Sequence, residues 1–155
     1  MTNALKLDID LFKNDDNLWD IEIDTNGDLK GSNSIDTAVL MSLFTDKRAD
    51  ASEIRDSKER RGWWGNLFND NEDYEIGSKL WLSTNQGRLT DDTLNAINSQ
   101  ALNCLVWMKE DNIVDDIKVS SNIIGNEQVR LNLKFIIGSN IINKYFILWE
   151  NSRWQ

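Results

Sequence analysis

The sequence contains no histidine, and Cys104 is the only cysteine among its 155 residues. Without histidine, no Ser-His-Asp or Cys-His catalytic arrangement and no His-ligated zinc or copper site can form. A single cysteine excludes an internal disulfide and a cysteine-based zinc cage, so we expect Cys104 to fill the core. Enzymatic alternatives are therefore limited to paired carboxylates, lysine or tyrosine chemistry, or an oxygen-ligated metal.

Long apolar runs and excess positive charge are also missing. No apolar stretch approaches the roughly 20 residues needed to cross a bilayer, and residues 1–8 do not read as a signal peptide. We therefore expect synthesis in the cytoplasm. With 17 Lys and Arg against 26 Asp and Glu, the formal net charge is −9. This charge repels phosphate backbones and anionic lipid, which argues against nucleic-acid or membrane partners.

The composition that is present, 40% hydrophobic and 28% charged, predicts a single globular domain over residues 1–155. Residues 18–24 alternate, with Trp19, Ile21 and Ile23 on one face, which predicts a half-buried strand. The Asn26-Gly27 dipeptide that follows favours a tight hairpin turn and a short return strand.

Two helices are expected. Ser34 can cap a helix over residues 35–44, and the apolar character of that segment predicts burial on nearly all sides. Thr90 can cap a second helix that extends to about Glu110, with apolar residues at helical spacing. Between them, residues 45–76 lose periodicity and predict a long loop, functional or partly disordered. Residues 77–82 fit either a helical turn or a strand.

The remaining sequence predicts a meander of three strands, over residues 117–124, 129–137 and 141–149, separated by turns at Gly125-Asn126 and Gly138 to Asn140. Two helices packed on one face of a mainly antiparallel sheet give an α+β fold. The last strand is apolar on both faces, so it is either covered on both sides or completed by a partner.

Three segments together resemble the Mu-like phage tail baseplate protein family named for Mu gene product forty-six. They are Thr37 to Ala49, Arg60-Arg-Gly-Trp-Trp-Gly65, and Gly77 to Leu82. The similarity runs from about Trp19 to about Glu110 and continues as a pattern through the terminal strands. Residues 1–17 carry none of it, and we expect them to form a flexible arm.

The resemblance implies a structural subunit of the baseplate in the virion tail, similar in role to the wedge or sheath-initiator protein of T4-like contractile tails. Implied partners are other wedge proteins and the tail tube and sheath subunits, with several copies in each baseplate. No cofactor, metal or catalytic residue is implied.

The segment with Arg60, Arg61, Trp63 and Trp64 is the first candidate docking site. Trp and Arg most often dominate interface energies, and the flanking glycines let the backbone bring both rings close to a surface. In the alternative interpretation both rings fold over the core as a lid and the arginines are solvated. Stacking of sugars or bases on the rings is a third interpretation.

The second candidate is the terminal strand, through Tyr145, Ile147 and Trp149. An edge strand can accept or donate a strand across subunits, with main-chain hydrogen bonds providing affinity. The alternative is a strand buried on both faces within its own domain.

Acidic clusters give weaker candidates. Residues 24–28 superficially suggest a calcium loop, but the spacing of an EF-hand is not met and a hairpin turn is favoured. Asp70, Glu72 and Asp73 form another acidic cluster that could hold a weakly bound divalent ion, but a solvated loop is favoured. Glu22 with Asp20 or Asp24 is the first carboxylate pair to test for a tail-associated cell-wall hydrolase. The sequence therefore favours a non-catalytic assembly protein, with that hydrolase and an adaptor unrelated to phage as alternatives.

Overall fold

The computed structural model describes residues 8–16, 18–32, 35–54, 59–68, 75–84, 89–125 and 128–148. By its contacts the chain divides into two compact units, Met1–Met41 and Ser42–Gln155.

The first unit contains two short antiparallel strand pairs. Strand β1 (Asp8–Ile9) pairs with β4 (Gly31–Ser32), and β2 (Leu11–Lys13) pairs with β3 (Trp19–Ile21). The predicted turn is confirmed: the Asp24 amide donates to the Asp28 carbonyl at 2.8 Å, and Gly27 takes a φ of +85°. Glycine suits that position because it has no Cβ to clash at positive φ.

The prediction of a half-buried strand is wrong for Ile21 and Ile23, which are 46% and 63% exposed. Alternation identifies side chains that share a face, but it does not show whether another layer covers that face. The side chain of Trp19 lies outside the described residues.

Helix α1 (Asp36–Phe44) buries a narrow stripe, formed by Ile35 just before the helix and by Val39 and Leu43 within it. These positions are four residues apart and therefore lie on one face. Met41 and Phe44 are exposed, so the prediction of burial on nearly all sides is wrong. The proposed cap, Ser34, lies outside the described residues.

The second unit is built around α3 (Asp91–Leu105), continued by α4 (Trp107–Glu110). The predicted cap is confirmed, because the Thr90 hydroxyl accepts a hydrogen bond from the Thr93 amide at 3.2 Å. The short helix α2 (Leu80–Thr84) packs against α3 and shows that part of residues 77–82 is helical.

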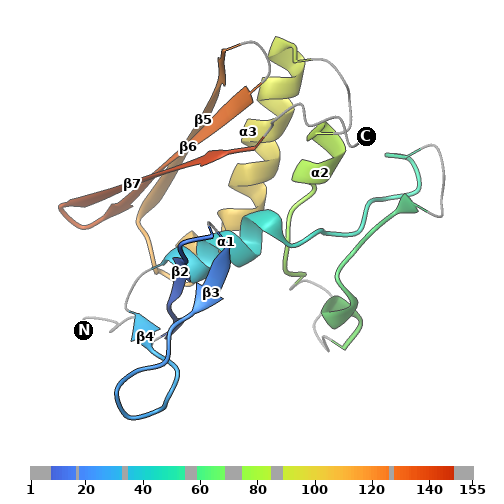
Figure 1. The fold of residues 1–155 in the computed structure, drawn as a ribbon. Helices are drawn as coiled ribbons and strands as arrows, with labels where there is room; N and C mark the ends of the chain where they lie inside the picture. Colours follow the sequence, from blue (N-terminus) through green and yellow to red (C-terminus); the bar gives the residue numbers. More distant parts are fainter. Residues whose placement is uncertain are drawn as a thin grey trace. The chain divides into compact units, whose positions relative to one another are not determined.

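The predicted three-stranded meander is also confirmed. Strands β5 (Asp116–Ile124), β6 (Gln128–Ile137) and β7 (Asn140–Ile147) form an antiparallel sheet in that order. Helix α3 lies along one face of this sheet and contacts β5, whereas no described helix of the unit covers the other face (Figure 1). The fold is α+β, as predicted.

The middle strand, β6, separates core from solvent. Its residues Val129, Leu131, Leu133 and Phe135 are at most 1% exposed, and each such burial stabilises the fold by roughly 1.5–3 kcal/mol. The alternate positions turn to the uncovered face, which we call the open face of the sheet.

Strand β7 is an edge strand, because it pairs only with β6 among the described residues. Tyr145 is 67% exposed and Ile147 is 45% exposed, so the interpretation of a strand buried on both faces is wrong. Apolar composition alone does not reveal whether a covering layer exists. None of the described helices has the length and apolar character needed to cross a membrane.

Candidate functional site

The segment after α1 is held in place by backbone pairing to the start of α2. The Lys47 amide donates to the Ser78 carbonyl, and the Ser78 amide donates to the Thr45 carbonyl, both at 2.9 Å. Gly77, with a φ of +115°, leaves room for this approach, because a Cβ there would stand 2.5 Å from the Thr45 carbonyl oxygen. The predicted long loop is therefore anchored at both of its ends.

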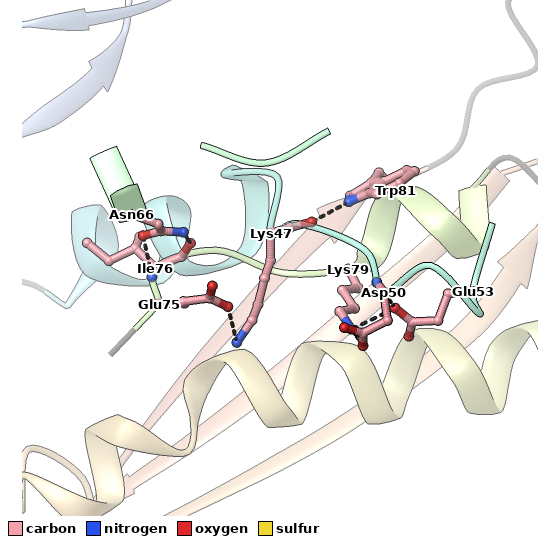
Figure 2. Close-up of polar contacts among 8 residues, drawn as sticks. All are labelled: Lys47, Asp50, Glu53, Asn66, Glu75, Ile76, Lys79 and Trp81. Atoms are coloured by element: carbon pink, nitrogen blue, oxygen red, sulfur yellow. Dashed lines mark hydrogen bonds and ion pairs between the residues drawn. The ribbon is translucent and has the colours of Figure 1, made fainter. Parts of the chain in front are cut away.

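Trp81 strengthens the same anchor. The residue is 7% exposed. Its Nε1 points to the Lys47 carbonyl (Figure 2) and donates a hydrogen bond to it at 3.0 Å. This Trp is a structural residue, since both its ring and its polar atom are used inside the unit.

An ionic cluster also links the segment after α1 to the residue that precedes α2. The Lys79 ammonium lies 2.8 Å from an Asp50 oxygen and 2.7 Å from a Glu53 oxygen (Figure 2). Burial of Lys79 lowers its pKa, but the hydrogen bonds to Asp50 and Glu53 outweigh it, so the pKa lies above its ordinary value. The hydrogen bond from Lys79 lowers the pKa of Asp50. Lys79 and Asp50 thus stay charged across the neutral range.

The structure places Arg60 and Arg61 in internal contacts. Arg60 Nε donates to the Ala49 carbonyl at 2.6 Å, and the Ala49 amide donates to the Arg60 carbonyl at 3.0 Å. Arg61 lies over the Trp81 ring at 4.8 Å and pairs with Asp46 at 3.1 Å. These contacts position the chain that leads into the tryptophan pair.

The two neighbouring tryptophans differ in environment. The Trp63 ring is half-buried and lies so close to Gly65 that a Cβ there would stand 2.4 Å from it. Trp64 is 69% exposed, and its ring centroid lies 5.9 Å from that of Trp63. The lid interpretation, in which both rings are covered, is therefore wrong for Trp64, and docking through this ring stays a prediction.

Trp64 begins a short 3-10 helix, Trp64–Phe68, that carries two more exposed apolar side chains. Leu67 is 79% exposed and Phe68 is 77% exposed, and the Phe68 ring meets the Trp64 ring edge-on at 6.0 Å. We call Trp64, Leu67 and Phe68 the aromatic knob. Sequence reasoning missed Leu67 and Phe68, although their spacing of three and four residues from Trp64 is the available signal.

A side-chain amide fixes the base of the aromatic knob. Asn66 accepts from the Ile76 amide and donates to the Ile76 carbonyl, both at 3.0 Å (Figure 2). A Lys47–Glu75 ion pair at 3.1 Å adds a second link nearby. The short helix is thus linked to Ile76 by two hydrogen bonds, although its apolar side chains are exposed.

The terminal strand shows a second set of exposed side chains. Tyr145 and Ile147 project on the open face of the sheet, where the Arg130 guanidinium lies 5.3 Å from the Tyr145 ring centre. The third predicted residue of this site, Trp149, lies outside the described residues.

The carboxylate candidates make local contacts within the first unit. Glu22 is exposed and makes a 2.6 Å ion pair with Lys30, and Asp20 accepts from the Ile21 amide at 2.8 Å. Asp24 accepts from two amides of its own turn. In the described part of the chain no three His, Cys, Asp or Glu side chains converge as metal ligands. The acidic cluster of residues 70–73 lies outside that part.

Comparison with known proteins gives a consistent family match. The profile of the family described as phage protein GP46 matches residues 35–140. Baseplate protein gp46 of Escherichia phage Mu is 40% identical over 94 residues, which are 59% of this chain and 62% of the Mu protein. Mu-like prophage FluMu protein gp46 of Haemophilus influenzae is 30% identical over 104 residues, 67% of each chain. The matches thus span about two-thirds of these relatives.

The matched range begins at residue 35 rather than near Trp19, and it extends beyond Glu110 to the start of β7. The aromatic knob lies inside it. Most of β7 and the strand pairs of the first unit lie outside it. The family profile therefore includes the knob and its anchoring segment.

Proposed function

This chain belongs to the phage protein GP46 family, and on that premise we propose that it is a non-catalytic structural subunit of a phage tail baseplate. The name of the Mu relative, a baseplate protein, supports this role. The anchored but uncovered aromatic knob supports action by docking, and the matched family range includes it.

The aromatic knob is the observation that carries the proposal. Three large apolar side chains on one short helix are 69–79% exposed, whereas the segment beneath them is fixed by hydrogen bonds. Trp residues of this kind often act as binding hot spots, and truncation of one costs about 2 kcal/mol or more, roughly 30-fold in affinity. An apolar hollow on a neighbouring tail protein is the complementary surface.

Strand β7 provides a second contact in the proposal, through Tyr145, Ile147 and Trp149. Its outer edge is unpaired among the described residues, and an extended segment of a neighbour can add to such an edge by main-chain hydrogen bonds. The resemblance to Mu-like tail proteins supports finer assignments: a contractile tail, several copies beside wedge and tube proteins, help in initiating sheath assembly, and synthesis in the host cytoplasm.

The test separates folding from assembly. The double variant Trp64→Ala/Phe68→Ala is introduced into the phage or prophage that encodes the chain, and assembled tails are counted by electron microscopy. A matched control, Leu102→Ala/Ile123→Ala, truncates two exposed apolar side chains elsewhere in the second unit. Circular dichroism and urea unfolding of both purified variants report on the fold.

We expect both variants to fold with near-normal stability and only the knob variant to lose tail assembly. Normal assembly by the knob variant would overturn docking through the aromatic knob. Loss of folding in that variant alone would favour the lid interpretation.

A further inference from the structure

Charge is strongly segregated along the chain. Residues 8–32 hold eight carboxylates and two lysines, a formal charge of −6 out of the total of −9. Residues 116–148 hold four cationic and two acidic side chains, a formal charge of +2. The part of the first unit that contains β1 to β4, which we call the acidic arm, is thus opposite in sign to the meander.

The positive charge of the meander is concentrated on the open face. Cross-strand pairing places Lys118 opposite Lys134, and Arg130 lies four residues before Lys134 on the same face of β6. Among the described residues no carboxylate forms an ion pair with these three cations. Asp116, at the end of this face, is paired with Lys109 at 3.0 Å.

Polar and aromatic groups complete this surface. A shallow groove crosses it, and its lining includes Lys118, Asn132, Lys134 and Tyr145. Asn132 is held by the Asn122 side chain at 3.0 Å, and Arg130 lies over the Tyr145 ring. The groove is therefore positive in sign, partly apolar and preformed, which suits an acidic extended segment with interspersed apolar side chains.

The acidic arm has that chemistry. Asp16, Asp20 and Asp28 are exposed on it, and so are Ile21 and Ile23. Its negative charge complements the cations of the groove, and its exposed Ile21 and Ile23 suit the apolar part of the lining. This complementarity points to the arm as the occupant.

We propose that the open face of the sheet binds the acidic arm of a second copy of this chain. The contact joins two different surfaces, so it is heterologous and repeats from copy to copy, closing into a ring or continuing as a filament. The contact does not involve Trp64, Leu67 or Phe68, so it can be tested separately from the aromatic knob.

The test uses two neutralised full-length variants. The face variant carries Lys118→Gln, Arg130→Gln and Lys134→Gln, which takes the formal charge from −9 to −12. The arm variant carries Asp16→Asn, Asp20→Asn and Asp28→Asn, which takes it from −9 to −6. Sedimentation velocity in low salt measures the association of the wild type, of each variant alone, and of their mixture. Circular dichroism confirms folding, and the single substitution Lys118→Gln serves if the triple face variant does not fold.

We expect the wild type to associate reversibly in low salt and to dissociate at about 0.5 M salt, since screening shortens the reach of exposed charges. Each variant alone is expected to associate at least 10-fold more weakly. Their mixture is expected to form a 1:1 complex that grows no further, because only one intact arm and one intact face remain.

Neutralising acidic residues reduces the overall repulsion between copies. An arm variant that associates more strongly than wild type would therefore overturn the proposal. A wild type that stays monomeric, or an unaffected face variant, would also overturn it and would leave knob docking intact.

Discussion

The Trp63 ring lies against the backbone of Gly65, two residues further along, where an added Cβ would stand 2.4 Å from the ring. The two tryptophans differ accordingly: the Trp63 ring packs on Gly65, whereas Trp64 is 69% exposed. With the Trp63 ring turned back over Gly65, Trp64 is left at the start of the short helix that bears the aromatic knob.

Gly65→Ala tests this contact. The substitution forces the Trp63 ring to move, and overpacking of this kind costs about 1–3 kcal/mol. Urea unfolding of Gly65→Ala, of Trp63→Ala and of the double variant gives a double-mutant cycle. In the Trp63→Ala background the alanine at position 65 is expected to cost much less. An equal cost in both backgrounds would mean that the ring does not constrain position 65.

Trp64 and Trp81 are expected to differ sharply in their contribution to stability. Trp81 is buried and donates to the Lys47 carbonyl, so Trp81→Ala is expected to cost about 3–5 kcal/mol. Trp81→Phe keeps most of the apolar contact and loses the hydrogen bond, at about 1–2 kcal/mol. Trp64→Ala is expected to change the unfolding free energy by less than about 0.5 kcal/mol. Similar losses for Trp64→Ala and Trp81→Ala would show that Trp64 packs inside.

The sequence was sufficient to predict the elements that depend on local patterns. The helix that begins after Thr90 and the meander with turns at Gly125 and Gly138 are confirmed, because capping, apolar period and turn glycines all act within a few residues. The α+β class follows from these elements. The Asn26-Gly27 turn was predictable for the same reason.

The contacts that shape the candidate site were not predictable, because they join residues far apart in the sequence. Arg61 is opposite Asp46 and lies over Trp81, and neither partner is within ten residues of it. A motif of adjacent Arg and Trp residues indicates interface chemistry, but it does not reveal which groups are already satisfied internally. Leu67 and Phe68 were missed because a 3-10 helix of five residues is too short to give its segment a recognisable apolar period.

The cluster of Lys79, Asp50 and Glu53 predicts a defined pH dependence. The raised pKa of Lys79 means that its contribution is complete below the unfolded value of about 10.4 and is lost as pH rises through the folded pKa. The lowered pKa of Asp50 means that its contribution is present above about 3.9 and is lost as pH falls through the folded pKa. Lys79→Met is therefore expected to destabilise the fold by about 1–2 kcal/mol between these limits.

The measurement is urea unfolding of wild type and Lys79→Met at a series of pH values. The two curves of unfolding free energy against pH are expected to separate in the middle and converge at both ends. Lys109→Met, which breaks the exposed Lys109–Asp116 pair, is the matched control and is expected to have a smaller effect. A difference between wild type and Lys79→Met that stays constant over the whole range would assign the loss to packing.

Cys104 is expected to be unreactive while the protein is folded. Its Sγ donates to the Ala101 carbonyl at 3.3 Å, and burial raises the pKa of the thiol to about 12. At pH 8 the thiolate fraction is then on the order of 10³-fold below that of a free cysteine with a pKa of about 8.5. Reaction with a chromogenic disulfide reagent should be slow in the native protein and complete within seconds to minutes in urea.

The same thiol predicts a loss of stability at high pH. Above about pH 8.5 the unfolded chain ionises its thiol while the folded chain keeps it protonated, so unfolding becomes more favourable until pH reaches the folded pKa. Cys104→Ala removes this slope, and it is expected to flatten the fall in unfolding free energy between pH 8.5 and pH 11. Fast labelling of the native protein at a rate independent of urea would show instead that the thiol is accessible in the folded state. Labelling that requires local opening becomes faster as urea is added, whereas labelling of an accessible thiol does not.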